Sequence, residues 1–141
     1  MFKDILIPIN TSDKATWENP VKTGIELAQA TGATLHVMTV FPRFDYPVVE
    51  SFFPVDFEEK AHAKANEELH KFVAENFPKG LKIQTIMAVG SVYEEILATA
   101  EKIKCDLIIM SRKGRLRRHF NLGSNVNRVI HHATTSVLVL E

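Results

Sequence analysis

The chain has 141 residues, of which 45% are hydrophobic and 24% are charged, and this size and composition predict a single globular domain over residues 1–141. Seventeen Lys and Arg residues balance seventeen Asp and Glu residues, which argues against a dedicated DNA- or RNA-binding domain. No apolar run is long enough to cross a bilayer, the opening MFKDILIPIN lacks a secretory pattern, and Cys105 is the only cysteine, so we expect a cytoplasmic protein without a disulfide.

The first two elements are a strand and a helix. Residues 3–9, KDILIPI, form a short run that is rich in Ile and Leu and bounded by polar residues, which is typical of a strand buried on both faces of a sheet. Apolar residues then recur at helical spacing, but the start of this helix is ambiguous. Ser12 or Asp13 could cap it, or Asn19 could cap a shorter helix with Pro20 in its first turn.

The middle of the chain predicts two further strands, a loop and a long helix. Residues 33–41 predict a second strand, which follows a helix and therefore pairs in parallel with the first. Residues 41–54 carry prolines and aromatic residues without a period and predict a long ordered loop, for which local packing is favoured over a partner site. An amphipathic helix runs from Asp56 to a stop near Gly80, and residues 81–89 predict the third strand.

The last part of the chain repeats the alternation. Ser91 and Glu94 have the spacing of a capping box, so we expect their side chains to satisfy free amides at the start of a helix. Residues 106–110 predict the fourth strand, residues 123–124 open another helix, and residues 137–140 predict the fifth strand. The alternation indicates an α/β fold, an open five-stranded parallel sheet with helices on both faces, whose ligands bind beyond the first and fourth strands.

Residues 110–126, MSRKGRLRRHFNLGSNV, combine the features of a phosphate site. The segment begins at the end of a buried strand, is basic, and finishes in Gly123 and Ser124 at a helix start. Such a start offers unpaired N–H groups and a partial positive charge, and glycine allows close approach of phosphate oxygens. Asn125 adds a side-chain donor. Because the same dipeptide is also a common helix cap, these residues alone leave phosphate binding and simple capping open.

Other chemistries lack a motif in this sequence. The Walker loop, the dinucleotide glycine fingerprint, CxxC, HExxH and the Gly-x-Ser-x-Gly elbow are all absent. His131 and His132 would point about 100° apart on a helix, so we expect surface or packing roles for them, and solvated positions for His62 and His70. A patch of basic residues could contact nucleic acid, but a solvated loop over phosphates is favoured by the zero net charge; the patch consists of Arg115, Arg117, Arg118 and His119.

Several segments together match the pattern of one known family: KDILIPI, MTV at the end of the second strand, DLIIMS, LGSN and the final VIHHATTSVLVL. On these segments, the whole chain resembles the universal stress proteins. Nucleotide-binding members carry Gly, two residues, Gly, nine residues and then Gly-Ser or Gly-Thr. Here Ser111 replaces the first glycine, eight residues separate Gly114 from Gly123, and Asn10 stands in place of an aspartate. Asn10 keeps a carbonyl and an amide that can bond a ribose hydroxyl, but it lacks the charge that attracts magnesium.

The resemblance implies a Rossmann-like sheet of the adenine nucleotide alpha hydrolase type with strand order 3-2-1-4-5. It implies a protein of stress response or signalling that binds ATP, with or without Mg²⁺, and that forms a homodimer through its last strand. The nucleotide-binding residues that it implies are Pro8, Ile9 and Asn10 on the adenine and ribose side, the main chain of Val40 at the adenine, and Met110, Ser111, Arg112, Gly114, Gly123, Ser124, Asn125 and Val126 around the phosphates.

Turnover is expected to be slow or absent, because no general base is evident beside the phosphate donors. We therefore assign no catalytic residue and no metal ligand. Two alternatives remain open. One is a dimeric interaction module of the same fold that does not bind nucleotide and uses residues 41–54. The other is a weak ATPase or autophosphorylating protein, with Ser111 or Ser124 as phosphate acceptor.

Overall fold

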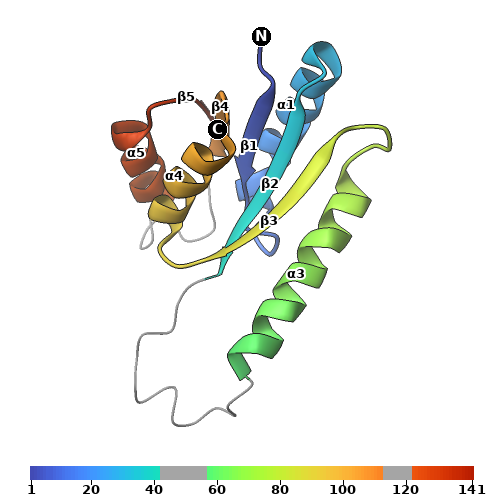
Figure 1. Cartoon of the computed structure of the whole chain (residues 1–141), viewed down its shortest axis with the longest axis vertical. Helices are drawn as coiled ribbons and strands as arrows, with labels where there is room; N and C mark the ends of the chain where they lie inside the picture. Colours follow the sequence, from blue (N-terminus) through green and yellow to red (C-terminus); the bar gives the residue numbers. More distant parts are fainter. Residues whose placement is uncertain (42–56, 113–121) are drawn as a thin grey trace.

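A five-stranded parallel sheet forms the centre of this computed structural model, which describes residues 1–41, 57–112 and 122–141 (Figure 1). The strand order is β3-β2-β1-β4-β5, which confirms the expected topology. All four strand pairings are parallel. The expected loop at 41–54 lies, apart from Phe41, outside the described residues. The strands are β1 (Asp4–Pro8), β2 (Thr34–Phe41), β3 (Ile83–Val89), β4 (Leu107–Ser111) and β5 (Ser136–Leu140).

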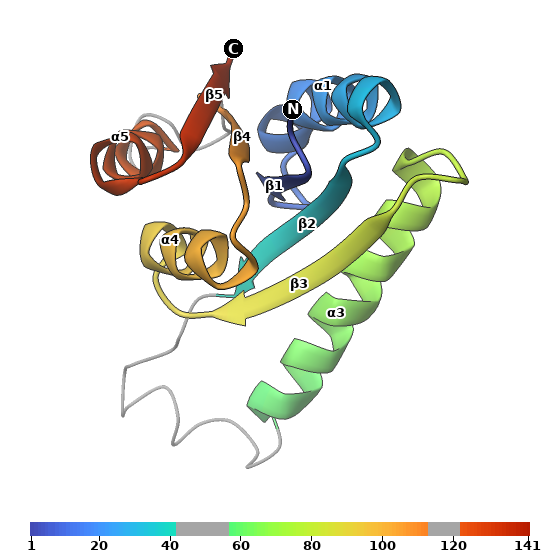
Figure 2. The same cartoon turned by 45° about the horizontal axis from the view of Figure 1, so that its top comes forward.

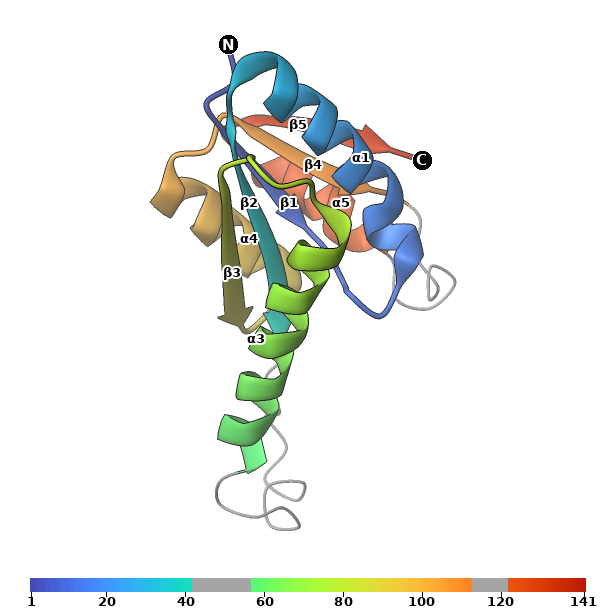
Figure 3. The ribbon, with the colours of Figure 1, turned by 90° about the vertical axis from the view of Figure 1, so that its right-hand side faces the viewer.

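Helices cover both faces of the sheet (Figures 2 and 3). On one face α1 and α3 pack against apolar side chains of β1, β2 and β4, and on the other face α4 and α5 do the same. No helix in the described part of the chain has the length and apolar character needed to span a membrane. The helices are α1 (Lys14–Thr31), α3 (Phe57–Asn76), α4 (Val92–Ile103) and α5 (Leu122–His132).

Strand β1 lies in the middle of the sheet and explains the apolar opening of the sequence. Ile5, Leu6 and Ile7 are all 0% exposed. Successive strand residues point to opposite faces, so Ile5 and Ile7 pack toward α1 and α3 while Leu6 packs toward α4 and α5. A strand between two helix layers must be apolar on both sides, and this is the pattern in the sequence.

The start of α1 is resolved in favour of Asp13. Its side chain accepts a hydrogen bond from the N–H of Ala15 at 3.3 Å, and Lys14 is the first helical residue. Pro20 therefore lies inside the helix and not at its start. The cap fixes the path of the chain between the end of β1 and α1, and residues of this loop line a cavity.

The expected capping box at α4 is wrong. Ser91 is the N-cap residue, but its side chain makes no capping hydrogen bond. The carboxylate of Glu94 accepts a bond from the Tyr93 hydroxyl at 3.1 Å instead of reaching back to Ser91. Glu95 also folds over the turn: its Oε1 would lie 2.8 Å from a Cβ at Gly90, whose φ is +148°. Only glycine fits this turn without strain.

Side chains tie together the amino ends of the strands. The carboxylate of Asp106 accepts from the N–H groups of Lys3 at 2.8 Å and Asp4 at 3.2 Å. His36, only 6% exposed, lies between Gln84 Oε1 at 2.5 Å and Asp4 Oδ1 at 2.9 Å. Three neighbouring strands, β3, β2 and β1, are thereby joined by polar contacts that stay within the protein.

Candidate functional site

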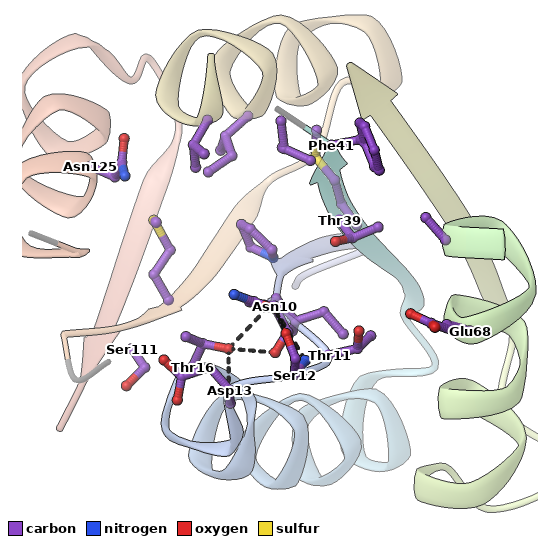
Figure 4. Close-up of a pocket in the computed structure, with 18 residues that line it drawn as sticks. Asn10, Thr11, Ser12, Asp13, Thr16, Thr39, Phe41, Glu68, Ser111 and Asn125 are labelled. Atoms are coloured by element: carbon purple, nitrogen blue, oxygen red, sulfur yellow. Dashed lines mark hydrogen bonds between the residues drawn. The ribbon is translucent and has the colours of Figure 1, made fainter. Parts of the chain in front are cut away.

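A cavity of about 420 Å³ lies beyond the carboxyl ends of the strands (Figure 4). Its walls come from the loop after β1, the ends of β2 and β4, and the helices α3, α4 and α5. The strand order reverses between β1 and β4, so the cavity occupies the place where parallel α/β sheets commonly bind ligands. This is also the place to which the sequence pattern pointed.

The cavity brings together many of the residues singled out from the sequence. The segments that contribute them are far apart in the chain and meet only because the carboxyl ends of their strands lie at the same end of the sheet. The residues of that set that line the cavity are Pro8, Ile9, Asn10, Val40, Met110, Ser111 and Asn125.

Of the remaining residues of that set, Arg112 and Val126 do not line the cavity, and the others are described only in part or not at all. The guanidinium of Arg112 pairs with the carboxylate of Glu141, and Val126 is 1% exposed in the core. Gly123 and Ser124 lie in the first turn of α5. Gly114 falls outside the described residues. A role for Arg112 at phosphates therefore stays a prediction that requires its ion pair with Glu141 to open.

The loop after β1 holds Asn10 in a fixed orientation. Asn10 Oδ1 accepts from the N–H of Ser12 at 3.1 Å and from its hydroxyl at 2.8 Å, and the Asn10 N–H donates to Thr16 Oγ1 at 3.0 Å. The carbonyl of the Asn10 side chain is thus occupied within the loop. Its Nδ2 group, for which the described residues offer no hydrogen-bond partner, is the group left for a ligand (Figure 4). Asn10 can therefore act as a donor there, which suits an oxygen or ring nitrogen and not a metal ion.

The main chain of Val40 faces the cavity. The N–H and C=O of one strand residue point to the same side, and this side alternates along the strand. The Met38 carbonyl accepts from Ile9 N–H at 2.8 Å toward β1, and the Phe41 carbonyl accepts from Gly90 N–H at 3.0 Å toward β3. The N–H and C=O of Val40 must therefore point toward β1, which has already ended at Pro8. Among the described residues no backbone group from that side pairs with Val40.

The lining combines an apolar wall with polar groups at both ends of the cavity, Asn125 and Ser111 at one end and Thr39 and Glu68 at the other (Figure 4). Ile9, Met38, Ile96 and Met110 are buried and can hold a flat apolar group such as a base. At one end, Asn125 lies in the first turn of α5, where helix N–H groups lack intrahelical partners. In the described part of the chain, no group of three His, Cys, Asp or Glu side chains could hold a metal ion.

Several lining residues were not anticipated from the sequence. Thr39 adjoins Val40, and Thr11, Ser12 and Thr16 follow Asn10, so the strand ends themselves could have indicated them. Glu68 comes from α3 and belongs to no motif. Its place depends on how α3 is rotated about its own axis against the sheet. The apolar pattern of the sequence indicates this rotation only approximately.

The histidines differ from one another. His70, His131 and His132 are exposed. The expectation of a solvated His62 is wrong, because its ring packs edge-on against Phe41 with ring centroids 4.6 Å apart. The apolar side of α3 turns His62 toward the end of β2, so this contact helps to hold α3 beside the cavity.

Comparison with known proteins supports the same fold. Universal stress protein MJ0531 of Methanocaldococcus jannaschii is 32% identical over 145 residues, which cover 100% of this chain and 83% of that protein. The solved structure of MJ0577 superposes with a TM-score of 0.81 at 26% identity, over 99% of this chain and 96% of the other.

Two solved structures of lower identity hold nucleotides. A universal stress protein in complex with cAMP has a TM-score of 0.63 at 20% identity, over 99% of this chain and 97% of the other. One from Archaeoglobus fulgidus in complex with dAMP has a TM-score of 0.64 at 16% identity, over 99% and 98%. The model of the universal stress protein family matches residues 1–141. The chain therefore belongs to the universal stress protein family.

Proposed function

We propose that the cavity binds an adenine nucleotide, with ATP as the expected ligand, and that the protein acts in stress response or signalling in the cytoplasm. The observation that carries this proposal is that three kinds of group converge on one cavity of about 420 Å³. These are the unpaired main chain of Val40, the Nδ2 donor of Asn10 and the first turn of α5. Family members that hold cAMP and dAMP support the choice of an adenine nucleotide.

The arrangement suggests how each part of the nucleotide is held. The base lies against the apolar wall, with its edge on the N–H and C=O of Val40. The ribose lies beside Asn10. The phosphates lie toward Ser111, Asn125 and the amides that begin α5. Because Asn10 presents a donor, magnesium would not be held through it, and ATP would bind with or without the metal.

Slow or absent turnover fits the same geometry. The carboxylate of Asp13 caps α1 by accepting from Ala15 N–H, which ties it to the helix. Asn125 and Ser111, at the phosphate end, are poor general bases. We therefore favour a nucleotide-binding protein over an ATPase, and rapid phosphate release would contradict this choice.

Thermal unfolding with and without ATP, ADP and AMP tests the proposal. A ligand at one hundred times its dissociation constant adds about 2.7 kcal/mol to the free energy of unfolding. Gly123→Val should abolish this gain, because its side chain would occupy phosphate space. Asn127→Val is the matched control, since it puts the same side chain on an exposed position of α5. No gain with any nucleotide would favour the interaction module.

We further propose a homodimer through β5. This strand forms one edge of the sheet and pairs with β4 alone among the described strands. Its residues are SVLVL, and an apolar edge with unpaired backbone groups tends to find a partner strand. Light scattering coupled to size exclusion should give twice the 15.9 kDa chain mass at micromolar concentration, and a monomer would contradict the dimer.

A further inference from the structure

Helix α3 places one carboxylate at the wall of the cavity. Glu68 and Ala65, one helical turn apart, both line it. The next residue, Leu69, is 0% exposed in the core, and Phe72 is 6% exposed. Core packing therefore fixes the rotation of α3, and with it the side of the helix from which Glu68 extends toward the cavity (Figure 4).

Within the described residues, Glu68 makes no ion pair or hydrogen bond. Lys71, one turn further along α3, lies 3.9 Å from Glu75 instead. The only other ionisable side chain among the described lining residues is Asp13, which caps α1. A carboxylate without a partner at a cavity wall is an acceptor available to a ligand.

Glu68 lies across the cavity from the phosphate end. Figure 4 shows Asn125 and Ser111 on one side and Glu68, with Thr39, on the other. A phosphate is attracted to the start of α5 and repelled by the carboxylate of Glu68. The base and the phosphates of a nucleotide are attached at opposite ends of the ribose, so phosphates at the start of α5 place the base on the α3 side.

We propose that Glu68 is a specificity-determining residue that reads the base by accepting a hydrogen bond from an exocyclic amine. The inference rests on the proposed function and adds the selection of 6-amino purines over 6-oxo purines. The adenine amine has two hydrogens, one for the Val40 carbonyl and one for Glu68, and the neighbouring ring nitrogen accepts from the Val40 N–H. A 6-oxo purine would place a carbonyl oxygen against both acceptors and leave them unpaired.

The test is calorimetric titration of AMP and IMP, which differ at C6 and N1 of the base, into the wild-type chain and the Glu68→Gln variant. We expect the wild type to prefer AMP by at least about tenfold. In the variant the amide can turn its N–H toward a 6-oxo group, so the preference should fall by about tenfold or reverse. Glu67→Gln is the matched control, because residue 67 is exposed on another side of α3 and should keep the wild-type ratio.

The outcomes separate this inference from the proposed function. If the wild type binds no adenine nucleotide at all, both are overturned. If the wild type prefers AMP and Glu68→Gln keeps the same ratio, or weakens AMP and IMP equally, nucleotide binding stands and the role of Glu68 is wrong. If the wild type binds AMP and IMP equally, the role of Glu68 is also wrong. Circular dichroism of both variants verifies that α3 remains folded.

Discussion

The two ends of the sheet differ in whether the protein satisfies its own polar groups. At the amino end, Asp106 accepts from two backbone N–H groups, and His36 is bonded on both ring nitrogens. At the carboxyl end, Val40 and Asn10 leave groups unpaired among the described residues, and these face a cavity. The backbone of a parallel sheet is similar at both ends, so the side chains and the loop paths decide which end can hold a ligand.

The amino end should govern stability and not binding. Asp106→Ala removes the acceptor of the Lys3 and Asp4 N–H groups, so we expect the free energy of unfolding to fall by about 3 kcal/mol. Urea unfolding measures this loss. The nucleotide-induced gain should stay at the wild-type value, and a reduced gain would mean that the two ends are coupled. Asp106→Asn, which keeps one carbonyl acceptor, should cost about half as much.

The amino end should also make stability depend on alkaline pH. Burial, followed by the charges of Asp106 and Asp4, raises the pKa of the Cys105 thiol from 9.0 to about 11. Below pH 9 the thiol is protonated in both states. As the pH rises from 9 to about 11 the unfolded chain ionises first, so up to about 3 kcal/mol of stability is lost.

Urea unfolding between pH 8 and pH 11 measures this loss against Cys105→Ala, which lacks the thiol. As the pH rises, the wild type should lose stability relative to the variant. Parallel curves for the wild type and the variant would contradict a raised pKa at Cys105.

The carboxyl end should show the opposite behaviour, a change in binding with little change in stability. Asn10→Asp keeps the acceptor for Ser12 but replaces the Nδ2 donor with a negative charge. Metal-free ATP should bind about tenfold more weakly, which is about 1.4 kcal/mol, and Mg²⁺ should restore part of the affinity. Calorimetry with EDTA and with Mg²⁺ measures both. If the wild-type protein binds ATP only in the presence of Mg²⁺, the donor role of Asn10 is contradicted.

The smallest expected effects on stability concern the N-cap residues of α1 and α4, two helices beside the cavity. Asp13→Ala should cost about 1 kcal/mol, because it removes a bond to Ala15 N–H. Ser91→Ala should cost only about 0.3 kcal/mol, because the Ser91 side chain makes no capping bond. Chemical unfolding of both variants measures the difference. Equal losses would show that Ser91 does cap α4 in solution.

Prediction from the sequence worked where one physical rule acts alone. Ile5, Leu6 and Ile7 are apolar because β1 is buried on both faces, and the alternation of strands and helices places the cavity after β1 and β4. It failed where two interactions compete, as at Glu94, whose carboxylate bonds Tyr93 and not the start of α4. It missed Glu68 because the rotation of a helix is set by packing against residues distant in the sequence.

The alternating direction of the peptide groups along β2, which turns those of Val40 toward the cavity, has a consequence for how such a site can change over evolutionary time. In the proposed site Val40 is recognised through its peptide groups, which every residue except proline carries in full. Position 40 is then free to drift among strand-forming residues while adenine recognition persists. Glu68, by contrast, contributes a side chain alone, so a single nucleotide change in its codon could redirect the protein toward another base.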